Sequence, residues 1–223
     1  MSYEAISIGS PRIAGSSSRH ERPELIPHIP FAETKIDGLR FRYALMGRGP
    51  TVVFVHGFTL DARVWAPQLQ AFSKKHQVLI YDQRGHGRSA ALTSDAPHRS
   101  HGEDLLALLD HLELSRVALV GSSMGGKTAL ELALEHPERV RELVLASPYL
   151  DGWKPSRQMA GVFRRVRTAM GRSGEAAAKE AWASSPFFRL ALSREHGPLL
   201  ERVLNQSVPE HWHKPPPPNS STM

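Results

Sequence analysis

Residues 121–128 read Gly-Ser-Ser-Met-Gly-Gly-Lys-Thr, and this segment constrains the fold more than any other part of the chain. Before it comes the short apolar run 116–120, and after it residues 128–136 have the apolar spacing of a helix. These flanks predict a buried strand that turns sharply into a helix. Strands that alternate with helices in this way belong to an α/β fold with a largely parallel sheet.

The same eight residues match two unrelated catalytic patterns. As G-x-S-x-G, Gly121–Gly125 predict a nucleophile elbow, a tight turn that lifts the hydroxyl of Ser123 clear of the backbone. As G-x-x-x-x-G-K-[ST], Gly121–Thr128 predict a phosphate-binding loop, in which Lys127 and backbone N–H groups hold the phosphates of a nucleotide. The second pattern is the rarer by chance because it needs a scarce Lys. More distant residues must separate a serine hydrolase from a nucleotide-binding protein.

The strands elsewhere in the chain favour the elbow. A phosphate-binding loop normally works with an apolar strand that ends in an Asp ligand to Mg²⁺. The apolar run that follows the loop, Leu143–Ala146, ends in Ser-Pro, and the run that ends in Asp82 comes before the loop, which is the less usual order. The β-branched run Thr51–Val55, by contrast, breaks into His56-Gly57-Phe58. Such a junction can supply a backbone N–H to an oxyanion hole.

Four motifs occur in the order and spacing of one family, over about residues 33–150. The chain resembles an α/β-hydrolase of the esterase, lactonase and perhydrolase type, and the matching motifs are Val55–Phe58, Tyr81–Ser89, Gly121–Gly126 and His136–Ser147. The resemblance implies that Ser123 is the nucleophile and that the N–H groups of Met124 and Phe58 form the oxyanion hole. Lys127 would then lie on the first turns of the helix behind Ser123.

The predicted fold is a mostly parallel α/β-hydrolase sheet with helices on both faces and a helical cap, and without the last two strands of the family. We expect a flexible arm at 1–30, the α/β-hydrolase core at 31–150, a helical cap segment at 151–207 and a disordered Pro-rich tail at 208–223. Within the cap segment, Gly171, Ser185-Pro186 and Gly197-Pro198 predict helix breaks.

The partners of Ser123 are not evident in the sequence. A serine nucleophile needs a His to accept its proton and an acid to orient that His. In the family both follow on loops after two further strands, whereas this chain offers Asp151 after its last predicted strand and His211 and His213 near its end. We expect a serine hydrolase for an ester, lactone or similar acyl substrate, truncated before the last two strands of the family and therefore impaired. The alternative is a non-catalytic fragment or binding protein.

Composition and charge limit which cofactors, compartments and partners we expect. The chain has no Cys, which excludes disulfides and thiolate metal sites, and neither a cofactor nor a metal is expected. No stretch is apolar and long enough for a leader or a membrane span, so we expect a cytoplasmic protein without a membrane partner. The net charge of +6 comes from scattered arginines, with a solvated basic face at 157–172, so no nucleic-acid partner is expected. Self-association is expected through the exposed edge of the strand at 143–145.

Overall fold

The computed structural model describes residues 29–91, 99–152 and 154–207 of the 223. Most of the expected arm lies outside the described residues. So does the expected tail with His211 and His213.

Within the described residues, six strands form one mixed sheet in the order β1-β2-β4-β3-β5-β6. Their bounds are β1 Ala32–Ile36, β2 Leu39–Met46, β3 Thr51–Val55, β4 Gln77–Tyr81, β5 Val117–Ser122 and β6 Val140–Ala146. The hairpin of β1 and β2 and the pairing of β2 with β4 are antiparallel, whereas β4, β3, β5 and β6 run parallel to one another. Asp37 and Gly38 both take positive φ, as a tight two-residue hairpin turn requires. The predicted α/β class is confirmed.

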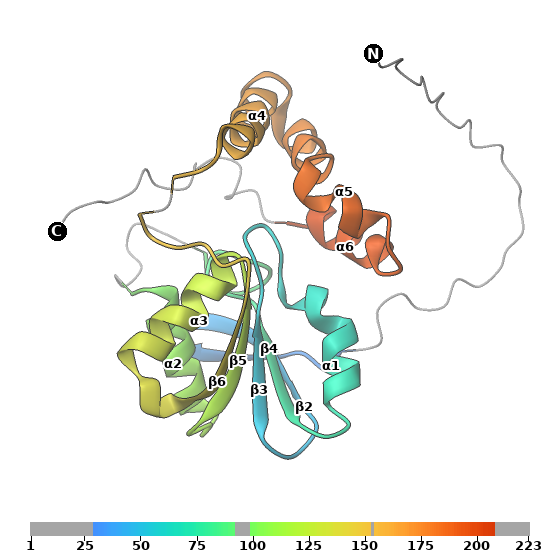
Figure 1. Cartoon of the computed structure of the whole chain (residues 1–223). Coiled ribbons are helices and arrows are strands. Elements are labelled where there is room, and N and C mark those ends of the chain that lie inside the picture. Colours follow the sequence, from blue (N-terminus) through green and yellow to red (C-terminus); the bar gives the residue numbers. More distant parts are fainter. Residues whose placement is uncertain (1–28, 92–98, 153, 208–223) are drawn as a thin grey trace, which may run out of the picture.

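Helices cover both faces of the sheet. On one face lie α2 (His101–His111) and α3 (Met124–Glu135), and on the other lies α1 (Ala66–Phe72), as Figure 1 shows. Two short 3-10 helices, η1 (Ala62–Trp65) and η2 (Pro137–Arg139), precede α1 and β6. Ser100 and Glu103 begin α2 with a reciprocal capping box, which satisfies two backbone N–H groups.

The side chains of β3 are buried on both faces of the sheet. Val53 and Val55 pack in the cluster under α2 and α3, and Val52 and Phe54 pack in the cluster on the α1 face. A strand in the middle of a sheet that is covered on both faces is buried along its whole length. The described part of the chain contains no helix with the length and apolar character needed to cross a membrane.

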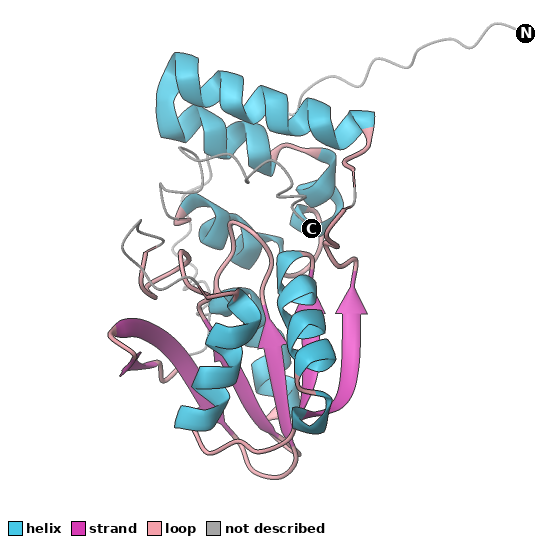
Figure 2. Ribbon diagram, turned by 90° about the vertical axis from the view of Figure 1, so that its left-hand side faces the viewer, coloured by secondary structure: helices cyan, strands magenta, loops and turns pink. Residues whose placement is uncertain are grey.

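A helical cap stands over one end of the sheet. It consists of α4 (Arg157–Ala183), α5 (Pro186–Leu192) and α6 (Gly197–Asn205). In Figure 2 the strand arrows point toward these helices, so the cap lies above the carboxyl ends of the parallel strands. Ligands of open α/β sheets bind at that edge.

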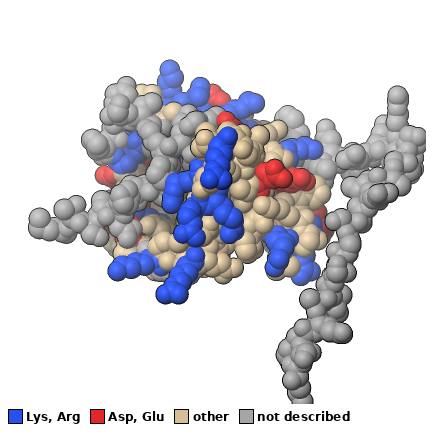
Figure 3. Space-filling view, turned by 90° about the horizontal axis from the view of Figure 1, so that it is seen from above, with Lys and Arg blue, Asp and Glu red and all other residues tan. Residues whose placement is uncertain are grey.

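The long helix α4 is amphipathic and interrupted. Val162 and Val166 are buried, whereas arginines of the same stretch are exposed at 164, 165, 167 and 172. Figure 3, seen from above, shows Lys and Arg side chains gathered on this side of the molecule. The break predicted at Gly171 is wrong by three residues. Gly174 takes φ 81° and ψ −170°, and this non-helical conformation suits a residue without a side chain.

Candidate active site

Ser123 occupies the tight turn between β5 and α3. Its backbone has φ 51° and ψ −113°, a region that residues other than Gly rarely adopt. The end of β6 and the loop after it hold this conformation: the Ser123 N–H donates to the Ala146 carbonyl at 3.0 Å, and the Tyr149 N–H donates to the Ser123 carbonyl at 2.9 Å. The Ser123 side chain is exposed. The turn therefore presents a hydroxyl at the surface of a fixed backbone.

Close backbone contacts explain the glycines around Ser123. A Cβ atom on Gly125 would lie 2.3 Å from the Val55 carbonyl oxygen, and one on Gly121 would lie 2.3 Å from the Gly125 carbonyl oxygen. Both distances are far shorter than a carbon–oxygen contact allows. The start of α3 can therefore pack against the ends of β3 and β5 only when these residues lack side chains.

The loop after β3 lies directly beside Ser123. Val55, the last residue of β3, is opposite Gly121 of β5, so both strands lead into their loops at the same level. A Cβ atom on Gly57 would lie 3.5 Å from the Cβ of Ser123. Phe58 follows Gly57 in this loop, and Met124 is the first residue of α3, whose N–H has no acceptor within the helix. The predicted oxyanion residues thus flank Ser123, and their donor role stays a prediction.

His56 is a structural part of this loop and not a base for Ser123. Its Nε2 accepts the Gln83 N–H at 3.0 Å, so Nδ1 carries the proton and donates to the Gly57 carbonyl at 2.9 Å. The ring is fully buried, and this burial lowers the pKa of His56 despite the hydrogen bond to Gly57. Both ring nitrogens are occupied and the ring is neutral.

Gln83 connects the loop to α3, a role that the sequence analysis missed. Its amide donates to the His56 carbonyl at 2.7 Å and accepts the Thr128 hydroxyl at 2.7 Å. Thr128 also lies 3.3 Å from the Met124 carbonyl. Gln83 stands inside the Tyr81–Ser89 motif, but no local spacing indicates that it bridges two other segments. Its partners become evident only when the strands are assembled.

This geometry does not fit a phosphate-binding loop. Thr128, which would bind Mg²⁺ in such a loop, is buried and bonded to Gln83. The Lys127 ammonium pairs with Glu131 at 3.2 Å and with Asp151 at 3.0 Å. Burial alone would lower the pKa of Lys127, but its hydrogen bonds to Asp151 and Glu131 outweigh burial and raise it. Lys127 is therefore engaged by carboxylates on the helix side, in agreement with the elbow interpretation.

Asp82, which the nucleotide interpretation would make a ligand of Mg²⁺, already accepts hydrogen bonds from three residues. Its carboxylate accepts the N–H groups of Ala62 and Arg88, both at 2.9 Å, and the guanidinium of Arg42 at 3.2 Å. Asp82 has no exposed surface. It ties the loops after β3 and β4 to β2 and is not available to a metal ion.

No imidazole is hydrogen-bonded to the Ser123 hydroxyl in the part of the chain that the structure describes. His86 approaches the Arg84 carbonyl at 3.2 Å through Nδ1, and its ring lies 6.0 Å from the ring of Phe58. His136 follows the last residue of α3, at the end remote from Ser123. Asp151, the alternative acid, is exposed and paired with Lys127. The proton acceptor of a triad is thus not found among the described histidines.

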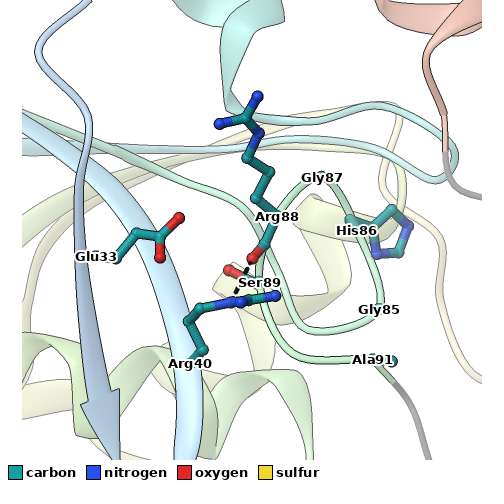
Figure 4. A pocket seen from close by; sticks show the side chains of 8 residues that line it. All are labelled: Glu33, Arg40, Gly85, His86, Gly87, Arg88, Ser89 and Ala91. Carbon is teal, nitrogen blue, oxygen red and sulfur yellow. Dashed lines mark hydrogen bonds between the residues drawn. The ribbon is translucent and has the colours of Figure 1, made fainter.

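A polar cavity of about 310 Å³ lies at the loop after β4 and is shown in Figure 4. Its walls come from β1, β2 and the loop after β4, and they consist of Glu33, Arg40, Gly85, His86, Gly87, Arg88, Ser89 and Ala91. The Arg40 Nε–H donates to the Arg88 carbonyl at 2.9 Å across it. No wall residue belongs to the elbow or to the loop 57–60. Acyl pockets are mostly apolar, so this cavity is not where we expect an acyl group.

Comparisons with known proteins agree with the geometry. A model of the alpha/beta hydrolase fold family matches residues 50–208. The protein named "Putative carbamate hydrolase RutD" of Caulobacter sp. (strain K31) is 39% identical over 125 residues, which are 53% of this chain and 44% of that protein. The 3-oxoadipate enol-lactonase 2 of Acinetobacter baylyi is 37% identical over 109 residues, 47% of this chain and 40% of that protein. The matched segments thus span less than half of these relatives.

Among solved structures, the enol-lactonase from Burkholderia xenovorans LB400 is 27% identical, with a TM-score of 0.67, and the match covers 81% of this chain and 70% of that one. A hydrolase from Pseudomonas aeruginosa PA01 gives a TM-score of 0.64 at 26% identity, over 83% of this chain and 69% of that one. The family model, the relatives and the elbow around Ser123 lead to one conclusion: the chain belongs to the α/β-hydrolase fold family.

Proposed function

We propose that this chain is a serine hydrolase for an ester, lactone or similar acyl substrate, with Ser123 as its nucleophile. The observation that carries the proposal is the conformation of Ser123, at φ 51° and ψ −113°, with Gly57 packed against it. Strained backbone persists only where its surroundings impose it, and it is concentrated at functional sites. The names of the relatives, a carbamate hydrolase and enol-lactonases, support an acyl substrate class.

Each group around Ser123 has a chemical role in this proposal. The Ser123 oxygen adds to the acyl carbon and gives up its proton to solvent water, while the electron pair of the C=O π bond moves to the carbonyl oxygen, which becomes an oxyanion. The N–H groups of Met124 and Phe58 donate to that oxyanion, and such donors stabilise the transition state because they are already oriented when charge develops. His56 and Gln83 hold the loop that carries Phe58.

The proton of Ser123 has no acceptor among the described histidines, and we therefore propose that turnover is impaired. Loss of the base in a comparable triad lowers turnover by about 10⁶-fold, whereas binding and the oxyanion hole alone retain roughly 10³- to 10⁴-fold over water. Weak esterase activity with a reactive Ser123 is the expected combination.

Labelling with a fluorophosphonate tests the nucleophile directly. We expect mass spectrometry of the labelled protein to find the adduct on Ser123, and Ser123→Ala to lose it. Ser122→Ala is the matched control, because it removes the neighbouring hydroxyl and should keep the label. Label that persists in Ser123→Ala, or a wild-type chain that takes up none, would refute the proposal.

A further inference from the structure

Two hydrogen bonds in series join the cap to the loop beside Ser123. The indole N–H of Trp182, near the end of α4, donates to the Thr59 hydroxyl oxygen at 2.7 Å. The Thr59 hydroxyl in turn donates to the Phe58 carbonyl at 2.7 Å. An indole can only donate and a carbonyl can only accept, so both directions are determined. Trp182 and Thr59 are buried, which shields these bonds from competition with water.

The backbone of this loop needs an external support. Thr59 has φ 62°, in the left-handed region, where a β-branched residue is a genuine outlier. Within the loop, the Leu60 N–H donates to the Gly57 carbonyl at 3.3 Å, a long contact for such a bond. The bond from Trp182 is shorter and comes from another element, 123 residues along the chain.

Apolar side chains of the loop 57–60 pack against the helices of the cap. Phe58 and Leu60 contact the apolar cluster of the cap, which includes Trp182. The ring of Phe163 stacks on Trp182 at 5.7 Å, and the ring of Phe58 lies 6.4 Å from it at a steep angle. Figure 1 shows the loop that follows β3 rising from the sheet toward the cap helices. The cap and the loop therefore share one core.

We propose that Trp182 is a positioning residue for the oxyanion hole: through Thr59 it fixes the backbone of Phe58, whose N–H is a proposed donor to the oxyanion. The inference rests on the proposed function and adds a role for the cap. In this inference the cap holds one half of the oxyanion hole in register with Ser123. A cap that is displaced leaves Thr59 without its donor and releases the loop.

Four variants separate the hydrogen bonds from packing. Trp182→Phe removes the N–H and keeps an aromatic ring, and Thr59→Val removes the hydroxyl and keeps the branched shape. Thr59→Ser keeps the hydroxyl and is the conservative rescue. Phe163→Leu disturbs the same cluster without touching either hydrogen bond, and it serves as the packing control.

Two measurements are made on each full-length variant. The first is the saturable rate of fluorophosphonate labelling of Ser123, which separates the maximal rate from the half-saturating concentration. Since loss of one oxyanion donor costs roughly 10²- to 10³-fold, we expect Trp182→Phe and Thr59→Val to lower the maximal rate by at least about 10-fold and to leave the half-saturating concentration nearly unchanged. Thr59→Ser and Phe163→Leu should stay close to wild type.

The second measurement is hydrogen–deuterium exchange of peptides that cover residues 57–60, and it needs no activity. We expect faster exchange there in Trp182→Phe and Thr59→Val, and not in the other two variants. Unchanged exchange and labelling in Trp182→Phe would overturn the inference, and so would an equal loss in Phe163→Leu. A wild-type chain without label would refute the proposed function instead, and exchange alone would then decide whether Trp182 holds the loop.

Discussion

Ser123 carries a conformation that its neighbours impose on it. Its carbonyl accepts the N–H groups of Gly126 at 3.0 Å and Tyr149 at 2.9 Å, and its own N–H donates to Ala146. These contacts come from α3 and from both sides of the end of β6, so the sheet has to be assembled before the turn is stable. A residue in such a sparsely populated region costs of order 1–3 kcal/mol.

Ser123→Gly therefore should stabilise the fold while it removes the nucleophile. Gly adopts positive φ without steric cost, and relief of the strain exceeds the larger chain entropy of Gly, so we expect the free energy of unfolding to rise by about 1 kcal/mol. Ser122→Gly is the control, because Ser122 lies in β5 and Gly should destabilise a strand by roughly 0.5–1 kcal/mol. Urea denaturation measures both. Equal destabilisation by the two changes would show that the turn is not strained.

At the scale of elements, β6 is the edge of the sheet in the described part of the chain. It pairs with β5 and with no other described strand. The Val144 side chain on this edge is more than half exposed, at 55%. An edge strand presents unpaired backbone donors and acceptors to any other chain, and apolar residues on it favour pairing.

We propose that the 223-residue chain self-associates through β6. Size-exclusion chromatography with light scattering, over a range of concentrations, should show species larger than a monomer. Val144→Lys should shift them toward the monomer, because a charged edge opposes pairing. Leu134→Lys is the matched control: Leu134 is 74% exposed on α3 and loses a similar apolar surface away from the edge. A monomer at every concentration, or equal effects of both changes, would contradict the proposal.

At the scale of the whole molecule, we expect the fully buried His56 and the half-buried His101 to make the free energy of unfolding depend on pH. Burial, and next the positive charge of Arg84, lower the pKa of His101 from 6.5 to about 4. Burial also lowers the pKa of His56. A group whose pKa is lower in the folded state binds protons more readily when the chain is unfolded, so stability is lost as pH falls through the window between the two values.

The window for His101 runs from about pH 6.5 down to about pH 4. Since one pKa unit corresponds to about 1.4 kcal/mol and the His101 side chain is 24% exposed, we expect a loss of about 2 kcal/mol across it. His101→Gln should flatten this part of the stability curve, as measured by urea denaturation between about pH 4 and about pH 7.5, a range that covers the whole window. A variant with the slope of the wild type would show that His101 does not titrate in this way.

Much of the candidate site follows from short segments of sequence. The apolar runs before His56 and Gly121 predicted two buried parallel strands, and the carboxyl ends of such strands meet at one edge of a sheet. It was the family resemblance that implied a place for Phe58 beside Ser123, and Gly57, which precedes Phe58, does lie against Ser123. The α/β class followed from the alternation of strand and helix patterns, whereas the helical cap followed from the family resemblance and from the purely helical pattern after residue 151.

What the sequence by itself determined is thus the type and order of the elements, because apolar spacing and Gly positions act over a few residues. The bonds of Gln83 to His56 and Thr128, and of Trp182 to Thr59, were decided by the tertiary structure. A side chain in one element has no local signal for its partner in another. The partner is selected when several elements pack around one core, and the support of the loop beside Ser123 arises only at that stage.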